Sequence, residues 1–287
     1  MSRQRLLVIG SRGFVGAHVA AAATDRYQVL PDTGIDITRA DTVRSSFDRQ
    51  RPDVVILTAA ISDIDRCQRE PERAELVNVT GAEIVATECA RIGARLIFTS
   101  SGAVYDGLKH GYTEDDPPTP ISVYGETKVR AEQIVTQHRS SIIVRLSLVL
   151  GLGLRPGSNS LLDKLVSSFS TRRPVNVAMN ESRNPIDVET LAWFLLALAD
   201  RPTVHGIYHL GSSDSWPRYD LIAAIADRLS APKSLLILQN EPNLGRAPRG
   251  LDHFLISTKI AAACGAQVPS TQQVLERCFD AVAQSHS

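Results

Sequence analysis

The sequence predicts an α/β protein with a doubly wound parallel sheet, followed by a smaller mixed α/β part. Short apolar runs recur in the first half of the chain, at residues 6–9, 53–58 and 142–146, as expected of strands buried on both faces of a sheet. Helix-length segments alternate with these runs, which favours parallel strands and right-handed crossovers. A glycine-rich loop directly follows the first run, at the edge where such sheets bind ligands.

Length and composition narrow the class of protein. The 287 residues are 43% hydrophobic and 22% charged, which is ordinary for a globular chain with a large core. Thirty-one basic residues balance thirty-one acidic ones, so no global field attracts nucleic acid or an anionic membrane. No apolar run approaches the roughly 20 residues of a membrane span. We expect a cytoplasmic protein without a nucleic-acid or membrane partner.

Cysteine and histidine usage points to neither disulfides nor a metal. The four cysteines are scattered and form no C-x-x-C pair, so reduced, buried thiols are expected. The seven histidines form no ligand-spaced cluster with acids or cysteines, and no metal site is predicted. A homodimer is compatible with the sequence, which does not determine the oligomeric state.

The glycine-rich loop reads Gly10-Ser-Arg-Gly13-Phe-Val-Gly16 and opens an alanine-rich helix that extends to about Thr24. Glycines permit a tight turn and a close approach of the backbone to a pyrophosphate, whose charge the helix N-terminus attracts. Strand, loop and helix together predict a Rossmann dinucleotide-binding unit. The candidate cofactor contacts in the loop are Gly10, Arg12, Gly13, Phe14, Val15 and Gly16.

Two residues give opposite indications about the adenosine ribose of the cofactor. The second strand, at residues 27–30, is followed by Asp32, and an acid at that strand tip favours a ribose with free 2′-hydroxyls. Arg12 argues the other way, since a guanidinium can pair with a 2′-phosphate. The predicted cofactor is therefore NADP or NAD, with NADP slightly favoured.

The segment after the second strand combines a candidate adenine contact with a helix start. Asp36 and Ile37 are placed to border an adenine. Thr38 and Asp41, three residues apart, have the spacing of a capping pair, and a helix is expected to begin near Arg39. Both roles can be combined in one turn of the chain.

Small residues follow the strand at 53–58. Thr58, Ala59 and Ala60 stand at its carboxyl end, where a ligand can approach the backbone closely. A long helix is expected at residues 72–93, and it contains Asn78. Because asparagine is mildly unfavourable inside a helix, we expect its side chain to hold neighbouring loops of the site together.

A hydroxyl, a phenol and an ammonium are predicted to meet in one place. A strand at residues 95–99 ends in the pair Ser100-Ser101, and Tyr124 and Lys128 follow after a proline-rich loop. Residues four apart share one face of a helix, so the ammonium can lie beside the phenol. A serine at the tip of a neighbouring strand can then reach both. Ser101, Tyr124 and Lys128 are therefore the candidate catalytic residues. Further candidate cofactor contacts are Thr58, Ala59, Ala60, Asn78, Tyr124 and Lys128.

The pattern loosens from Gly151 onward. We expect a dinucleotide-binding domain at 1–150, with returning segments near 184–212, and a mainly substrate-binding part at 151–287. The expected helices lie at 161–171, 191–199, 218–229, 257–264 and 270–283, and the expected strands at 175–178 and 207–210. Basic residues recur in the connecting segments: Arg155, Arg172, Arg173, Arg183, Arg246 and Arg249. Arg183 and Arg249 are the preferred pair for a phosphate clamp.

The candidate residues occur in a characteristic order along the chain: the glycine loop, Thr58-Ala-Ala60, Ser101, Tyr124 and Lys128. This order resembles the extended short-chain dehydrogenase/reductases, and most closely the branch that contains the dTDP-4-dehydrorhamnose reductases. The most specific stretches are PDVVILTAA at 52–60, VYDG at 104–107 and VYGETKVRAE at 123–132. RNPIDVETLA and GIYHLG, later in the chain, also fit this pattern.

The resemblance implies a role for each catalytic candidate. Tyr124 would donate or accept the proton, Lys128 would be its electrostatic partner, and Ser101 would orient the substrate oxygen. A neighbouring ammonium, with the positively charged nicotinamide, is expected to lower the phenol pKa from its usual value of about 10 toward the working pH. The implied substrate contacts are Gly102, Ser147, Arg183 and Arg249.

The sequence departs from the dehydrorhamnose reductases in the expected substrate pocket. Their strand tip resembles S-T-D-Y-V-F-D-G, whereas Gly102 and Ala103 replace the acid and the aromatic residue in this chain. Leu148 stands where those enzymes have a tryptophan after the fifth strand. Both differences concern the sugar that is bound rather than the redox groups.

Three functions fit the sequence. The first is reduction of a keto group on a nucleotide-linked deoxysugar, such as a dTDP-4-keto-6-deoxyhexose. A nucleotide-sugar 4-epimerase fits the S-S-x-x-V-Y pattern, and a non-catalytic regulatory subunit resembling the methionine adenosyltransferase beta subunit would retain the cofactor fold. Two related classes do not fit. A 4,6-dehydratase would show Thr-Asp-Glu at the strand tip, whereas this chain has Ser101-Gly-Ala103, and a fucose-synthase-type enzyme would have a cysteine there, which this chain lacks.

Overall fold

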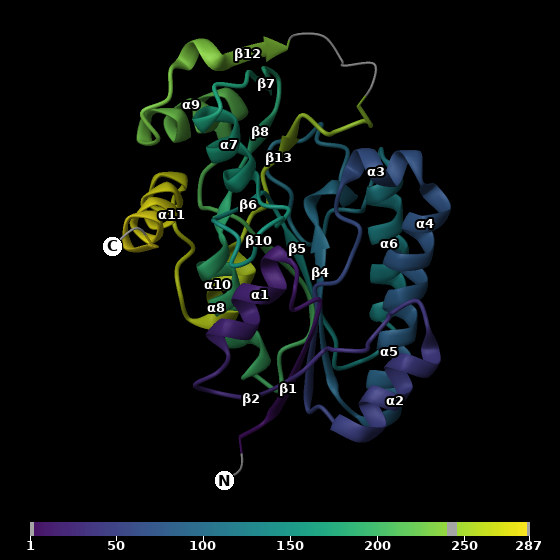
Figure 1. Ribbon diagram of the computed structural model, residues 1–287. Coiled ribbons are helices and arrows are strands. Elements are labelled where there is room, and N and C mark those ends of the chain that lie inside the picture. The colour runs from purple at the N-terminus through teal and green to yellow at the C-terminus, as the bar shows by residue number, and fades with distance from the viewer. Residues whose placement is uncertain (1–2, 240–245, 286–287) are drawn as a thin grey trace.

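The computed structural model describes residues 3–239 and 246–285, and its centre is a six-stranded parallel sheet (Figure 1). The strand order is β10-β5-β4-β3-β1-β2, and each neighbouring pair is parallel. Strand order reverses beside β1, as in doubly wound sheets. The bounds are β1 Arg5–Ile9, β2 Gln28–Leu30, β3 Val54–Leu57, β4 Arg95–Ser101, β5 Ile142–Leu146 and β10 Gly206–Leu210.

Helices cover both faces of this sheet because its strands carry apolar side chains on both faces. Leu6 and Val8 of β1 belong to the core beneath α1, α8 and α10, while Leu7 and Ile9 belong to the core beneath α2, α5 and α6. Figure 1 shows these two helical layers on opposite sides of the sheet. Their bounds are α1 Phe14–Ala22, α8 Val188–Ala199, α10 Thr258–Cys264, α2 Ala40–Gln50, α5 Gly81–Ile92 and α6 Val123–Val135. The predicted fold class is confirmed.

The C-terminal part has a separate apolar core and lies over one end of the sheet (Figure 1). Its helices are α7 Leu161–Ser170, α9 Arg218–Arg228 and α11 Thr271–Ser285. Small sheets support them: β7 Val175–Ala178 with β12 Leu236–Gln239, β6 Val149–Leu150 with β9 Ile186–Asp187, and β8 Ser182–Arg183 between β11 Trp216–Pro217 and β13 Asp252–His253. In the sequence between β9 and β11, α8 and β10 return the chain to the large sheet.

The long helix expected at 72–93 is interrupted where Asn78 lies. It consists of α4 Pro71–Glu75, a π-helical turn η1 Leu76–Thr80, and α5. Such turns widen a helix locally and often occur at functional sites. Here the turn places Asn78, which is 2% exposed, against the segment after β3.

Two local expectations need correction. Thr38 and Asp41 do not form a capping pair, because α2 begins at Ala40 and its N-cap residue is Arg39. The Thr38 hydroxyl instead donates to the Asp36 carboxylate at 2.7 Å. A short helix that the sequence analysis did not predict, α3 Ile64–Arg69, follows β3, and the Asp63 side chain caps it by accepting a hydrogen bond from the Arg66 amide. 

Residues 3–239 and 246–285 contain neither a candidate membrane span nor a candidate metal site. None of their helices is both long and apolar enough to cross a membrane. No group of three or more histidine, cysteine, aspartate or glutamate side chains in these ranges is arranged to hold a metal ion.

Candidate active site

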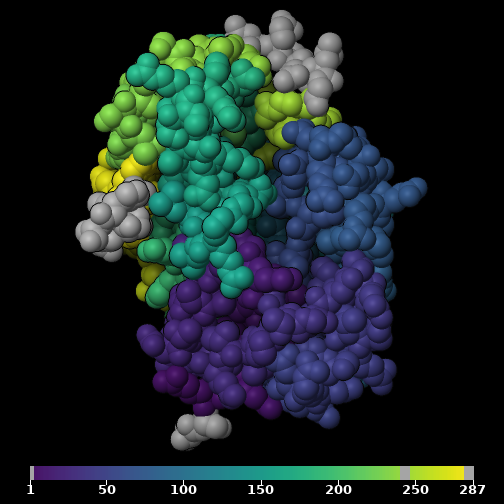
Figure 2. Space-filling view, viewed as in Figure 1, coloured from purple at the N-terminus to yellow at the C-terminus, as the bar shows by residue number. Residues whose placement is uncertain are grey.

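A cleft of about 740 Å³ opens at the carboxyl ends of β1, β3, β4 and β5, beneath the C-terminal part. Figure 2 shows the surface hollowed between the teal segment near residues 150–170 and the blue N-terminal half. The cleft brings together predicted residues from seven segments of the sequence. These are Arg12, Gly13, Phe14, Val15, Gly16, Thr58, Ala60, Ser101, Gly102, Tyr124, Lys128, Ser147, Arg183 and Arg249.

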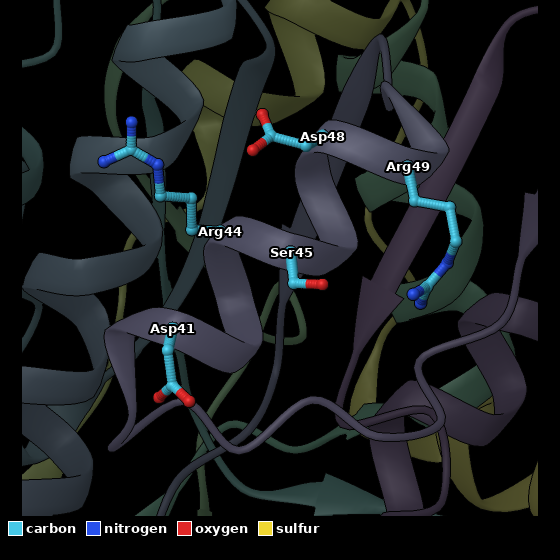
Figure 3. Close-up of a pocket in the computed structure, with 5 residues that line it drawn as sticks. All are labelled: Asp41, Arg44, Ser45, Asp48 and Arg49. Atoms are coloured by element: carbon cyan, nitrogen blue, oxygen red, sulfur yellow. The ribbon is translucent and has the colours of Figure 1, made fainter.

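A second hollow lies on the outer face of α2, and Asp41, Arg44, Ser45, Asp48 and Arg49 line it (Figure 3). All five side chains are exposed. Figure 3 shows Arg44 and Arg49 pointing in different directions rather than toward a common centre. This hollow has the character of a solvated helix face, so the cleft is the candidate site.

The glycine loop has the geometry of a dinucleotide cradle. Gly10 has φ +97°, a conformation that favours glycine, and its carbonyl accepts a hydrogen bond from the Gly13 amide at 2.9 Å. A Cβ atom on Gly16 would lie 2.2 Å from the Gly10 oxygen. No described side chain caps the N-terminus of α1, so its first amides can bind an anion. These residues fit the pyrophosphate of a nicotinamide dinucleotide.

Asp32 supports the same loop. Its carboxylate accepts hydrogen bonds from the Gly10 amide at 3.1 Å, the Ser11 amide at 2.9 Å and the Ser11 hydroxyl at 2.7 Å. An acid therefore lies beside the loop, while Arg12 is exposed and lines the cleft. The acid that favours free ribose hydroxyls and the arginine that favours a 2′-phosphate both lie at this loop, so NADP and NAD are both candidates.

The other predicted residues do not line the part of the cleft that the structure describes. Asp36 is exposed, whereas Ile37 is 7% exposed and packs in the core beside Gly81. Ala59 is partly buried against the same core. The Asn78 amide group accepts from the Ile61 amide at 2.8 Å and donates to the Thr127 hydroxyl at 3.2 Å. It thus holds the segment after β3 against α6, as the sequence predicts.

Helix α6 delivers Tyr124 and Lys128 to the tip of β4. Ser122 caps the helix by accepting from the Gly125 amide at 3.2 Å. A Cβ atom on Gly125 would lie 2.2 Å from the Ala103 oxygen, so only glycine permits the helix to approach the β4 tip this closely. Lys128 Nζ donates to the Thr99 carbonyl at 2.8 Å. These contacts put the phenol and the ammonium beside the end of β4.

Burial dominates the charge state of the two groups on α6. It raises the pKa of Tyr124 to about 12, although a hydrogen bond with Ser101 acts in the opposite direction. Burial also lowers the pKa of Lys128 to about 7. The expectation that Lys128 lowers the Tyr124 pKa is wrong for the protein groups by themselves, because burial raises that pKa and disfavours the charged form of both groups.

The two arginines chosen as a phosphate clamp are bonded within the protein. Arg183 is 8% exposed and donates to Glu181 at 3.1 Å and to the carbonyls of Gly250 and Leu251. Arg249 donates to both carboxylate oxygens of Asp65 at 2.9 and 2.8 Å. Both arginines line the cleft, but in this structure their donors hold its wall together.

Arg218 is a cleft residue that the sequence analysis did not select. Its guanidinium lies 3.8 Å from Glu181, and it makes no hydrogen bond to another described side chain or carbonyl. It is the first residue of α9, where a basic side chain is unfavourable toward the helix dipole. A basic residue at the first position of a predicted helix is therefore a sequence feature that could have identified Arg218 as a candidate. Arg155 and Arg246 also line the cleft, whereas Arg172 and Arg173 are exposed outside its described wall.

The strand–glycine loop–helix unit and the convergence of Ser101, Tyr124 and Lys128 in one cleft define an extended short-chain dehydrogenase/reductase. This is an NAD(P)-dependent class of enzyme. The sequence model of the RmlD substrate binding domain matches residues 4–284. The chain belongs to this family.

Three relatives that are each 30% identical to this chain have different named functions. The chain is 30% identical to dTDP-4-dehydrorhamnose reductase of Aggregatibacter actinomycetemcomitans, over 95% of this chain and 97% of that protein. It is 30% identical to the spore coat polysaccharide biosynthesis protein SpsK of Bacillus subtilis, over 85% and 86% of the two chains. It is also 30% identical to methionine adenosyltransferase 2 subunit beta of Xenopus tropicalis, over 90% and 81%.

Solved structures agree with this family. The dTDP-4-dehydrorhamnose reductase of Bacillus anthracis, in complex with NADP, has a TM-score of 0.89 and 25% identity, over 96% of this chain and 99% of that one. The UDP-glucose 4-epimerase of Thermotoga maritima, with UDP-glucose, has a TM-score of 0.85 and 19% identity, over 99% and 100%. The second likeness shows the fold alone.

Proposed function

We propose that this protein is an NAD(P)-dependent reductase of a keto group on a nucleotide-linked deoxysugar, such as a dTDP-4-keto-6-deoxyhexose. The observation that carries the proposal is the buried Tyr124–Lys128 pair beside Ser101, in a cleft with the glycine loop on one side and arginines on the other. The similarity to dTDP-4-dehydrorhamnose reductases supports this choice of reaction.

The protonation state of Tyr124 suits reduction. With its pKa raised by burial to about 12, the phenol keeps its proton at neutral pH and can donate it to a developing alkoxide. The Ser101 hydroxyl, which lines the same cleft as Tyr124, orients the keto oxygen toward that proton. The nicotinamide cofactor supplies the hydride when bound. Lys128 lies behind the phenol and favours its anion after the proton has left.

The charge of the cleft suits a diphosphate. The chain as a whole is neutral, yet cations outnumber acids on the cleft wall. The basic lining residues are Arg12, Lys128, Arg155, Lys164, Arg183, Arg218, Arg246 and Arg249, and the acidic ones are Asp63, Asp65 and Glu181. A local excess of positive charge in a concave site concentrates anionic substrates.

Arg218 is the proposed contact for that diphosphate, because the donors of Arg183 and Arg249 are already engaged. Arg218→Gln should raise the KM for the sugar nucleotide by about 10- to 100-fold, the effect of losing one charge-assisted hydrogen bond, with kcat changed little. Steady-state kinetics measure this. Arg173→Gln, at an exposed position outside the described cleft wall, is the matched control. A KM equal to that of the control would remove Arg218 from the binding site.

A panel of keto sugars tests the reaction itself. Purified protein with NADPH and a dTDP-4-keto-6-deoxyhexose should oxidise the cofactor, followed by its absorbance. A 4-epimerase would retain cofactor tightly and interconvert sugar epimers without consuming NADPH. A regulatory subunit, which the similarity to methionine adenosyltransferase 2 subunit beta keeps open, would bind cofactor, turn over no keto sugar and form a stable complex with a partner enzyme.

A further inference from the structure

Glu132 is a carboxylate buried next to the catalytic groups. It lies on α6, one helical turn after Lys128 and two after Tyr124, and it is 3% exposed. A buried carboxylate is costly unless its oxygens are hydrogen-bonded and its charge is paired. Its partners therefore indicate which elements it connects.

Two neighbouring strands supply those partners. Ser100 of β4 donates to Glu132 Oε1 at 2.5 Å, and Arg145 of β5 donates from Nε at 3.0 Å and from Nη2 at 2.6 Å. Ser100 and Arg145 are paired directly across the two parallel strands, so one carboxylate joins α6 to both. Because Ser100 immediately precedes Ser101, this junction fixes the position of the catalytic serine relative to Tyr124.

Arg145 continues the contacts to the cleft wall. Its Nη1 donates to the Tyr105 hydroxyl at 2.5 Å, and that hydroxyl also lies 3.0 Å from His209 Nε2 on β10. Tyr105 lines the cleft. We call Ser100, Glu132, Arg145, Tyr105 and His209 the Glu132 network; its five side chains are buried and extend from the catalytic helix to the edge strand of the sheet.

Few groups act on the charge of Lys128. On the side of β4, its Nζ faces the Thr99 carbonyl and lies 4.0 Å from the centre of the Phe98 ring, neither of which titrates. The titratable groups around it are Tyr124 and Glu132 on α6 and the Cys67 thiol of α3. The Glu132 carboxylate is the largest influence that opposes the lowering of the Lys128 pKa by burial.

We propose that Glu132 is a positioning residue for the reductase site. It holds α6 in place against the tip of β4, so that Tyr124 meets Ser101, and its negative charge, one helical turn away, favours the ammonium form of Lys128; Arg145 is its counter-charge. The kinetic part of this inference rests on the proposed function. The electrostatic part does not, because the charge of Lys128 can be measured without any substrate.

Ser100→Ala tests the positioning role while it leaves the Glu132–Arg145 pair intact. We expect kcat with NADPH and a dTDP-4-keto-6-deoxyhexose to fall about 10-fold, and the KM for NADPH to stay within about 2-fold. The matched control is Ser141→Ala. Its hydroxyl is equally buried and donates to the Val135 carbonyl at 2.8 Å, at the other end of α6. Equal kcat in the two variants at equal thermal stability would show that Ser100 only stabilises the fold.

The electrostatic role is tested by NMR titration of the full-length protein labelled with ¹³C at lysine Cε. Glu132→Gln alone leaves the Arg145 charge buried without a partner, so the double variant Glu132→Gln/Arg145→Met is used as well. We expect the titration midpoint of Lys128 to fall by about one pH unit. The signals of Lys109, Lys164, Lys233 and Lys259 are internal controls, and Lys128→Met assigns the signal. An unchanged Lys128 midpoint in a folded variant overturns this role.

The two measurements separate the failure of this inference from that of the proposed function. If the wild-type protein reduces no keto sugar, the proposed function is wrong, and the NMR titration still decides whether Glu132 sets the charge of Lys128. If the wild type is active but neither variant alters kcat or the Lys128 midpoint, the Glu132 network is a structural ion pair only.

Discussion

Tyr124→Phe is expected to lower the turnover of the keto sugar by about 10²- to 10⁴-fold, the usual contribution of a positioned general acid. The affinity for NADPH should stay within about 2-fold of the wild type. The ring of Tyr124 packs in an apolar cluster with Cys67, Ala74 and Ala103, and phenylalanine keeps that packing. Only the phenolic hydroxyl is lost, and with it the proton that is donated.

Steady-state kinetics and a fluorescence titration with NADPH measure these two effects separately. The control is Tyr27→Phe, because the Tyr27 hydroxyl is hydrogen-bonded to Asp200, outside the described cleft wall. Its kcat should match that of the wild type. Unchanged turnover in Tyr124→Phe would contradict the proposed acid, whereas parallel losses of turnover and of NADPH affinity would indicate a disturbed cleft instead.

Lys128→Met is expected to abolish most of the activity and, at the same time, to stabilise the protein at neutral pH. Lys128 is 2% exposed, and its ammonium pairs with a carbonyl and a ring rather than with a carboxylate. Burial lowers its pKa to about 7 from the ordinary value of 10.5, although the Glu132 carboxylate acts in the opposite direction. Methionine removes this cost and fills a similar volume.

The sign of the pH dependence follows from the lowered pKa. Below pH 7 the folded protein must carry the buried ammonium, and the full cost is present. Between pH 7 and 10.5 the unfolded chain binds more protons than the folded one, so the wild-type free energy of unfolding rises with pH. At about 1.4 kcal/mol for each unit of pKa shift, less the contacts that methionine loses, the gain at pH 6 should be about 2 kcal/mol.

Denaturant unfolding at pH 6 and pH 9.5 checks this prediction. The advantage of Lys128→Met over the wild type should be larger at pH 6 and should shrink toward pH 9.5. Lys233→Met, at a surface lysine paired with Asp227, should show no such gain. A constant difference between Lys128→Met and the wild type at the two pH values would mean that Lys128 does not titrate in this range.

Local sequence patterns predicted the fold because apolar runs, glycine loops and helical spacings involve only residues that are close together in the sequence. The apolar run of β1 followed by Gly10, Gly13 and Gly16 can form few structures other than a strand, a tight turn and a helix. The spacing of Tyr124 and Lys128 places both on one face of α6 wherever that helix packs. The resemblance of these stretches to the extended short-chain dehydrogenase/reductases implied the class of enzyme, and the strand order of the sheet agrees with it.

Pairings between distant segments could not be predicted in the same way. The sequence analysis selected Arg183 and Arg249 for a phosphate because both lie in polar loops, but Asp65, 184 residues away, engages Arg249. The carbonyls of Gly250 and Leu251, 67 and 68 residues away, engage Arg183. Whether an arginine is available to a ligand depends on such partners, and its sequence neighbours do not reveal them. Arg218 was missed although a basic residue at the first position of a helix is a signal that the sequence contains.

The sequence by itself determined the doubly wound sheet, the dinucleotide-binding loop and the identity of the catalytic candidates, since each depends on periodicity or fixed spacing. Only the tertiary structure decided their charge states. The sequence predicts a lowered Tyr124 pKa from a neighbouring ammonium, but the packed structure raises it, because desolvation depends on all the atoms that surround the phenol. Tertiary packing likewise revealed Glu132, buried between two strands and the catalytic helix.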